Sequence, residues 1–213
     1  MPSDVAAAMD RMYRHQRHVY DLTRKFYLFG RDRLIASLAP EPGDRLLEIG
    51  CGTARNLIRL AHRHPGIALY GIDASVEMLK TADAAIDRAG LRERIATRRC
   101  LAERLDAKAT FDIDQPFDGV MCCYALSMMK AWPTVIEGAL ANLKPGGRLD
   151  IVDFWNDWPG WARGPLAAWL SLFDVTPRPE LAERLRQRAA RRGGHLTVAR
   201  LLGGYAFHIT YWK

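Results

Sequence analysis

The sequence predicts a doubly wound α/β fold with a mostly parallel sheet, and three observations support this. Short apolar runs alternate with stretches of helical periodicity from about residue 44 to residue 154, which is the pattern of βαβ units. The first run ends in a glycine turn at residues 50–52, and the second run ends in Asp73. An acid at this distance from a glycine turn is typical of sheets that bind a nucleoside at the carboxyl ends of their strands.

The expected elements follow one another with short connections. Helical periodicity over residues 5–38 leads through a Pro- and Gly-containing turn at 39–44 into the first strand. We expect five core strands, at 45–49, 67–72, 95–99, 118–123 and 149–154, with helices at 55–64, 75–88 and 132–143. The C-terminal part predicts Pro-broken helical segments and then two strands, at 161–173, 179–192, 196–201 and 205–212.

Length and composition indicate a single cytoplasmic domain. The chain has 213 residues, and no run of about 18 apolar residues is present to span a membrane. The N-terminus lacks the basic-then-apolar order of a signal peptide. The four cysteines, which show neither a metal-ligand spacing nor a disulfide pattern, are Cys51, Cys100, Cys122 and Cys123. We therefore expect a reducing compartment and no metal, with Cys122 and Cys123 in the core.

The net charge of +7 is concentrated in two segments. Residues 11–33 contain seven Lys or Arg and two Asp, and residues 178–192 contain six Arg and two Glu. Such basic segments attract anionic partners, either nucleic acid or an anionic lipid surface.

Two residues around the glycine turn narrow the class of nucleoside. A dinucleotide fingerprint has Gly or Ala at its sixth position for close helix–strand packing, but Arg55 stands there. Glu48, two residues before Gly50, would repel a pyrophosphate and suits a ligand that carries an ammonium group. We therefore infer S-adenosylmethionine rather than a dinucleotide. The alternative is an ordinary strand–turn–helix junction.

Together with residues 143–148 (Leu-Lys-Pro-Gly-Gly-Arg) before the fifth strand, these residues resemble the class I methyltransferase family over about 34–154. The resemblance implies a Rossmann-like sheet with an antiparallel last edge and N-terminal helices that cover the cofactor. It divides the single domain 1–213 into cap helices at 1–38, a cofactor-binding core at 44–154, and substrate-side helices with the final strands at 155–213.

The resemblance also assigns the cofactor contacts. Glu48 is expected at the α-ammonium, the glycine turn gives backbone access, and Asp73 is expected at the ribose hydroxyls. Leu101 stands where many relatives have an Asp that receives the adenine amine, so backbone groups are expected to replace that contact. The full set of expected cofactor residues is Tyr20, Arg24, Glu48, Gly50, Cys51, Gly52, Asn56, Asp73, Ala74, Met78, Leu101, Ala102, Tyr124 and Ser127.

Tyrosine and arginine alternate in the N-terminal segment at helical spacing, at Tyr13, Arg17, Tyr20, Arg24, Tyr27 and Arg31. A solvated basic face explains the arginines but not the aromatic side chains, whereas Tyr–Arg pairs suit a bound carboxylate or phosphate beside an apolar chain. We assign Tyr20 and Arg24 to the cofactor's carboxylate. Tyr13 and Arg31, with Trp155, are the expected substrate-binding residues.

Several acceptor classes lack their characteristic residues. The segment 124–127 (Tyr-Ala-Leu-Ser) has neither the amide nor the prolines of DNA adenine enzymes, and Cys122 and Cys123 have no preceding Pro as in cytosine enzymes. We therefore expect no nucleic-acid substrate. A lipid fits better, because four tryptophans fall within residues 155–169 and Trp prefers the headgroup region. The segment 161–173 then lies on a bilayer or covers an apolar pocket, unless it is a buried helix packed on the sheet.

Residues 12–33, which begin Met-Tyr-Arg-His-Gln-Arg-His-Val-Tyr, resemble bacterial betaine-lipid N-methyltransferases, and residues 124–128 and 202–205 continue the likeness. The resemblance implies methylation of diacylglyceryl-homoserine to diacylglyceryl-trimethylhomoserine at the cytoplasmic face of an anionic membrane. His15, Tyr27 and Asp153 are candidates for the residue that takes the amine proton. The alternatives are methylation of phosphatidylethanolamine or a quinone precursor, and a non-catalytic cofactor-binding subunit that docks on RNA or protein. The sequence leaves the oligomeric state open.

Overall fold

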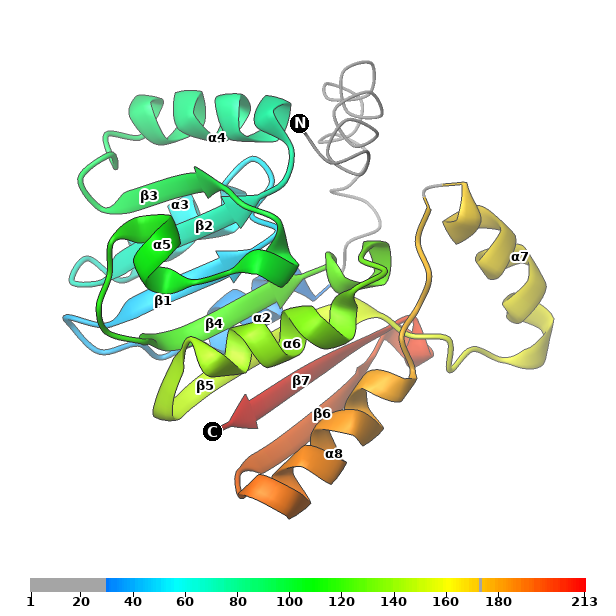
Figure 1. Ribbon diagram of the computed structural model, residues 1–213. Coiled ribbons are helices and arrows are strands. Elements are labelled where there is room, and N and C mark those ends of the chain that lie inside the picture. The colour runs from blue at the N-terminus through cyan, green and yellow to red at the C-terminus, as the bar shows by residue number, and fades with distance from the viewer. Residues whose placement is uncertain (1–29, 173) are drawn as a thin grey trace.

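The strands form one seven-stranded sheet in the order β3-β2-β1-β4-β5-β7-β6 (Figure 1). The computed structural model describes residues 30–172 and 174–213. Strands β1 to β5 run parallel, and β7 is antiparallel to both β5 and β6. The strands are β1 (Arg45–Ile49), β2 (Ala68–Asp73), β3 (Ile95–Arg99), β4 (Phe117–Cys123), β5 (Leu143–Phe154), β6 (His195–Leu201) and β7 (Ala206–Trp212). The predicted doubly wound sheet with an antiparallel edge is confirmed.

Helices cover both faces of the sheet. The α-helices are α2 (Arg31–Ser37), α3 (Arg55–Arg63), α4 (Val76–Arg88), α5 (Ala107–Phe111), α6 (Trp132–Ala141), α7 (Gly160–Ser171) and α8 (Glu180–Arg192). Short 3₁₀ turns are η1 (Ala102–Arg104), η2 (Leu126–Met128) and η3 (Leu202–Gly204). One apolar cluster joins α2, α3 and α4 to the sheet, and a second joins α6 and α8 to its other face. Burial on both faces explains why the parallel strands read as continuous apolar runs.

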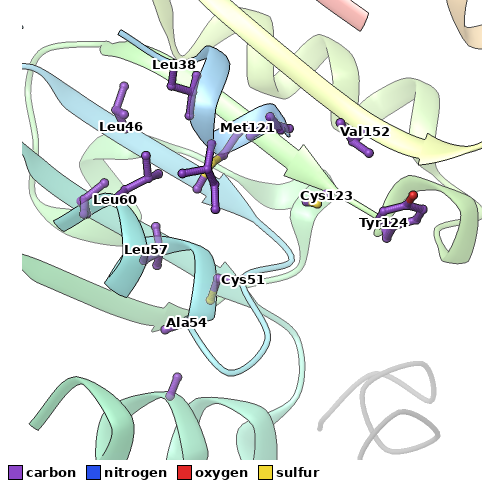
Figure 2. Packing of buried hydrophobic residues seen from close by; sticks show 14 of the residues in the cluster. Leu38, Leu46, Cys51, Ala54, Leu57, Leu60, Met121, Cys123, Tyr124 and Val152 are labelled. Carbon is purple, nitrogen blue, oxygen red and sulfur yellow. The ribbon is translucent and has the colours of Figure 1, made fainter. Parts of the chain in front are cut away.

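The cluster on the first face packs α3 and α2 against the central strands, as Figure 2 shows. Leu57 and Leu60 of α3 are fully buried and lie over the sheet together with Leu46 of β1 and Met121 of β4. Gly71 of β2 lets α3 approach, because a Cβ at this glycine would lie 2.7 Å from Leu57 Cδ1. This close contact fixes the distance between α3 and the ends of β1 and β2, where α3 begins.

From residue 45 onward, the expected elements agree with the structure to within a few residues, with two exceptions. β5 begins at Leu143 and not at 149, because Leu143 pairs with Phe117 before a bulge in the register. The second exception is the short helix α5, which was not expected because its sequence shows no apolar periodicity. It begins where the Asp106 side chain caps it by accepting a hydrogen bond from Ala109 N–H. Within the described ranges, no helix is both long and apolar enough to cross a bilayer.

The N-terminal prediction requires a correction. Helical periodicity predicted helix over 5–38, either continuous or as two helices with a bend near Asp21, and it placed Arg31 on one face with the stripe residues of the second half. Gly30 instead adopts a left-handed conformation (φ 90°), and α2 begins after it at Arg31. This backbone conformation favours glycine, because a side chain would be strained at φ 90°, and a Cβ there would also crowd Leu201 Cδ1 at 2.7 Å. Arg31 is therefore the first residue of α2. The other predicted site residues of this segment, Tyr13, His15, Tyr20, Arg24 and Tyr27, lie outside the described residues.

The contact between α3 and the sheet predicts the cost of truncating Leu57. Leu57→Ala should lower the free energy of unfolding by about 2–5 kcal/mol. The substitution leaves a cavity between α3 and the sheet, and neither element can move in to fill it. The matched control is His62→Ala on the exposed side of the same helix, which should change it by no more than about 0.5 kcal/mol. Urea denaturation followed by circular dichroism measures both variants, and equal costs would contradict this packing.

Candidate functional site

The candidate site lies at the carboxyl ends of the central strands, where the strand order reverses between β1 and β4. The chain leaves β1 through a tight turn in which Gly50 (φ 72°), Gly52 (φ 55°) and Ala54 (φ 60°) are all left-handed. Gly50 N–H and Cys51 N–H both donate to the Ile72 carbonyl, at 2.9 and 3.0 Å. This position is where open α/β sheets bind ligands, because helix N-termini and strand ends converge there.

Asp73 connects the end of β2 to the glycine turn. Its Oδ2 accepts a hydrogen bond from Gly52 N–H at 2.9 Å, and its Oδ1 accepts one from Ser75 N–H at 2.9 Å. An ionised carboxylate offers about four acceptor positions, so these two bonds are compatible with the expected contact to ribose hydroxyls. Asp73 therefore sets the shape of the turn in addition to its expected role toward a ligand.

Glu48 is a buried acid directly below the turn. It is 1% exposed, and its Oε1 accepts a hydrogen bond from Asn56 Nδ2 at 2.7 Å. Its Oε2 is buried and has no hydrogen-bond partner among the described residues. Burial raises the pKa of Glu48 to about 7, which the Asn56 hydrogen bond and the Arg31 guanidinium only partly oppose. A buried acceptor of this kind is completed by a cationic donor.

Arg31, at the start of α2, reaches the same region. Its positive charge lowers the pKa of Glu48, and both its charge and a hydrogen bond lower that of the Cys123 thiol. Burial has the larger effect on Cys123 and raises its pKa to about 12. Arg31 Nε is buried and has no hydrogen-bond partner among the described residues. A guanidinium therefore lies beside the ends of β1 and β4 with unused donor capacity.

The loop after β4 is shaped by a second buried acid, Asp153 at the end of β5. Asp153 Oδ2 accepts a hydrogen bond from Ser127 N–H at 3.0 Å, and Oδ1 accepts one from Phe154 N–H at 2.7 Å. Burial raises the Asp153 pKa to about 6. Tyr124 begins the loop in a left-handed conformation (φ 55°), with its ring 4.6 Å from that of Phe154. Asp153 thus holds the backbone that carries Tyr124 and Ser127.

The remaining predicted cofactor residues lie along the same edge. Ala74 follows Asp73, and Met78 is buried in the first turns of α4. Leu101 is half-buried and precedes η1, while Ala102 is buried, and Cys100 N–H donates to the Asp73 carbonyl at 3.1 Å. The ends of β1 to β4 thus bring together the described members of the predicted set.

Trp155, a predicted substrate-binding residue, lies just beyond the end of β5. Its ring packs edge-on against Phe207, and its backbone N–H donates to the Tyr205 carbonyl at 2.9 Å. It borders an open pocket of about 570 Å³ at the base of α7, whose walls are formed by Trp155, Asn156, Asp157, Trp158, Arg163 and Ala167. The predicted substrate residue therefore lines a pocket next to the end of β5.

The sequence did not indicate the contact between Arg31 and Cys123. Cys123 was expected only as a core residue, and it is buried as expected. Cys123 contacts Arg31 because it is the last residue of β4, at the edge of the sheet where the candidate site lies. This position at the strand end was the only feature of the sequence that could have suggested the contact, because no motif surrounds the thiol.

The arrangement fits a nucleoside that carries a cationic amino-acid group. The glycine turn lets the backbone come close to a ligand, and a Cβ at Gly50 would lie 2.7 Å from Ala125 Cβ. Glu48 offers a buried, unfilled acceptor, and Asp73 lies at the end of the next strand. These are the features that S-adenosylmethionine requires: an acceptor for its ammonium group, an acid near its ribose, and close backbone approach.

Comparison with known proteins agrees with this site. Residues 46–147 match the family model described as a methyltransferase domain. The chain is 34% identical over 123 residues to the 27-O-demethylrifamycin SV methyltransferase of Amycolatopsis mediterranei, covering 58% of this chain and 43% of that protein. It is 33% identical over 127 residues to a phosphatidylethanolamine N-methyltransferase of Cereibacter sphaeroides, covering 59% of this chain and 56% of that protein.

A solved structure shows the same fold. An S-adenosylmethionine-dependent methyltransferase from Aquifex aeolicus superposes with a TM-score of 0.61 at 18% identity, covering 89% of this chain and 92% of that one. The chain spans about half the length of the curated relatives it matches. Both relatives are named as methyltransferases, and their names give different acceptors.

The raised pKa of Glu48 predicts that cofactor affinity depends on pH. A bound ammonium group favours the carboxylate, so binding lowers the Glu48 pKa below its free value of about 7 and releases a proton. The affinity for S-adenosylhomocysteine should therefore rise by up to about tenfold per pH unit towards pH 7 and level off above it. Titration calorimetry across this range measures the slope.

Glu48→Gln should flatten this slope and weaken binding at pH 8, because the amide keeps the shape but loses the charge. The matched control is Glu103→Gln, which removes an exposed carboxylate from η1 and should keep the slope. An unchanged slope in Glu48→Gln would exclude Glu48 as the titrating group.

The two hydrogen bonds of Asp73 predict a large effect of its removal. Asp73→Ala should weaken S-adenosylmethionine binding by about 1.5–3 kcal/mol, because it removes a charged acceptor and releases the turn at Gly52. Asp114→Ala, which removes an exposed carboxylate paired with Lys108, should bind as the unmodified protein does. Equal affinities in calorimetry for the two variants would argue against a site at Asp73.

Proposed function

We propose that this chain, whose residues 46–147 match a methyltransferase domain, is an S-adenosylmethionine-dependent lipid N-methyltransferase. The proposed reaction converts diacylglyceryl-homoserine to diacylglyceryl-trimethylhomoserine by successive methyl transfers. The proposal combines the resemblance of residues 12–33 to betaine-lipid enzymes with one feature of the site. That feature is the Arg31 guanidinium beside the ends of β1 and β4.

Arg31 supports an acceptor that carries its own carboxylate. A homoserine headgroup presents a carboxylate next to the amine that is methylated, so a cation is needed close to the transferred methyl. Arg31 lies near enough to influence both Glu48 and Cys123, and its Nε has no hydrogen-bond partner among the described residues. A guanidinium can hold such a carboxylate with two parallel hydrogen bonds. Tyr20 and Arg24 are proposed for the cofactor's own carboxylate.

The protein's contribution to the transfer is to position both reactants. When bound, S-adenosylmethionine supplies a sulfonium methyl: the amine lone pair forms the new N–C bond while the C–S electron pair stays with sulfur. Glu48 and Asp73 hold the cofactor side, and Arg31, Tyr13 and Trp155 hold the acceptor side. Alignment of the two partners and exclusion of water are the terms that lower the barrier in such a reaction.

The acceptor amine must lose a proton before it attacks. Asp153 has a pKa raised to about 6, but both of its oxygens accept backbone N–H groups and the side chain is 1% exposed. This geometry favours a positioning role for Asp153 over direct proton transfer. His15 and Tyr27 remain our proposed candidates for the proton acceptor.

A membrane surface is the proposed place of action. The net charge of +7 is concentrated in residues 11–33 and 178–192, and anionic lipid attracts such basic segments. The pocket at the base of α7 is lined by Trp155 and Trp158, whose rings suit the boundary between headgroups and acyl chains. We propose a peripheral position on the cytoplasmic face of the membrane.

A second candidate acceptor is phosphatidylethanolamine. The similarity to the phosphatidylethanolamine N-methyltransferase of Cereibacter sphaeroides favours it. Its amine has a phosphate neighbour in place of a carboxylate, so the two lipids present different anions to Arg31. A comparison of both lipids therefore separates the two candidates.

The role of Arg31 predicts a selective effect of Arg31→Lys. Lysine keeps the charge but loses the two-pronged hydrogen-bond geometry, so the KM for diacylglyceryl-homoserine should rise about tenfold while the Kd for S-adenosylhomocysteine stays nearly unchanged. Arg33→Lys on the exposed side of the same helix is the matched control and should leave both constants unchanged. A methyl-transfer assay on lipid–detergent micelles, together with calorimetry, measures them.

The same assay should show far better turnover of diacylglyceryl-homoserine than of phosphatidylethanolamine. Equal turnover of both lipids would refute the betaine-lipid proposal and leave a broader lipid N-methyltransferase. A loss of cofactor affinity in Arg31→Lys would instead place Arg31 on the cofactor side of the site.

A further inference from the structure

Helix α7 is apolar on two opposite sides. It projects from the body of the domain at the right of Figure 1. Its inward side packs through Leu166, Trp169 and Leu170 on the first core cluster, which includes the buried Trp158 and Val175. Its outward side carries a second apolar stripe, formed at helical spacing by Trp161, Pro165, Ala168 and the C-cap residue Leu172.

The outward stripe is strongly exposed. Trp161 is 82% exposed and Leu172 is 78% exposed, and they stand about three helical turns apart on the same side. An amphipathic surface helix would place polar side chains there, because only one of its sides meets the core. Exposed aromatic and aliphatic side chains in such a row mark an interaction surface.

The charge of the segment favours a lipid surface. From Trp158 to residue 173 the only charged side chain is Arg163, and the nearest acids in the sequence are Asp157 and Asp174. Arg163 Nε donates to the Trp158 carbonyl at 3.1 Å, so this cation lies at the base of the helix. An apolar stripe with a basic residue and no acid suits the headgroup–acyl boundary of an anionic bilayer.

The segment before α7 is attached to β6, and the segment after it is attached to the loop after β4. Before the helix, Asp157 pairs with Arg200 at 3.1 Å, and the Arg200 guanidinium also donates to the Asp157 carbonyl. After the helix, Thr176 N–H donates to the Ser127 carbonyl at 2.9 Å. A surface that binds through α7 is therefore held in a defined position relative to the loops after β4 and β5.

We propose that the outward stripe of α7 docks the protein on an anionic bilayer, with Trp161 and Leu172 inserted at the headgroup–acyl boundary. This rests on the proposed lipid function, because it brings the pocket bordered by Trp155 and Trp158 to the membrane. A second copy of the chain fits this stripe less well than a bilayer does. The stripe is about 18 Å long and one side chain wide, whereas a stable protein interface buries roughly 1,200–2,000 Å².

The test is sedimentation of the full-length protein with vesicles of phosphatidylcholine and phosphatidylglycerol. The double variant Trp161→Gln/Leu172→Gln should bind these vesicles about tenfold more weakly, because it removes the inserted apolar area but no charge. Its affinity for S-adenosylhomocysteine should not change, which controls for folding. Unchanged vesicle binding by this variant would overturn the proposal.

A second measurement locates the inserted side chain. Vesicles with brominated acyl chains should quench part of the tryptophan fluorescence, and Trp161→Phe should lose most of that quenching while it still binds the vesicles. Phenylalanine is the matched control because it keeps an apolar ring and removes only the fluorophore. Equal quenching in the protein with and without Trp161 would show that another surface inserts, and would overturn the proposal.

Two further outcomes separate docking from the proposed activity. A water-soluble, short-chain diacylglyceryl-homoserine should be methylated equally by both forms, while only the unmodified form should act efficiently on the long-chain lipid in vesicles. Vesicle binding through α7 without turnover of either lipid would refute the proposed function and support the docking. If ultracentrifugation shows a dimer that the double variant dissociates, the occupant is a second copy and the docking proposal is wrong.

Discussion

The Asp73 carboxylate is the contact on which the rest of the candidate site depends. It accepts hydrogen bonds from Gly52 and Ser75, so one side chain ties the end of β2 to the turn after β1 and to the start of α4. The Ile72 carbonyl holds the N–H groups of Gly50 and Cys51, whereas the Gly52 N–H depends on this carboxylate. Without it, the Gly52 N–H would lose its partner, and the turn of the candidate site would lose its shape.

A second constraint is the burial of two acidic side chains whose hydrogen bonds do not fully offset the loss of contact with water. Glu48 and Asp153 are both nearly inaccessible, and burial raises the pKa of each, to about 7 and about 6. The two acids are used differently. Asp153 satisfies both oxygens with backbone groups and so shapes a loop, whereas Glu48 keeps one oxygen without a described partner, as a site for a cationic ligand requires.

The substrate side is built from elements outside the central sheet. Arg31 enters from α2, Trp155 follows β5, and α7 is anchored near both Ser127 and Asp157. The candidate cofactor residues of the central sheet are thus separate from the residues proposed to hold the acceptor. The relatives named for rifamycin and for phosphatidylethanolamine are methyltransferases with different acceptors.

The sequence by itself determined the α/β fold, the strand positions and the cofactor class. Apolar runs that alternate with helical periodicity, and the spacing of Glu48, the glycine turn and Asp73, are local signals that need no tertiary information. The contact between Arg31 and Cys123, the exposed outward side of α7 and the left-handed conformation of Gly30 were decided only by the tertiary structure. They depend on which distant segments pack together: Gly30, for example, lies against Leu201 of β6, a residue whose position no local pattern reveals.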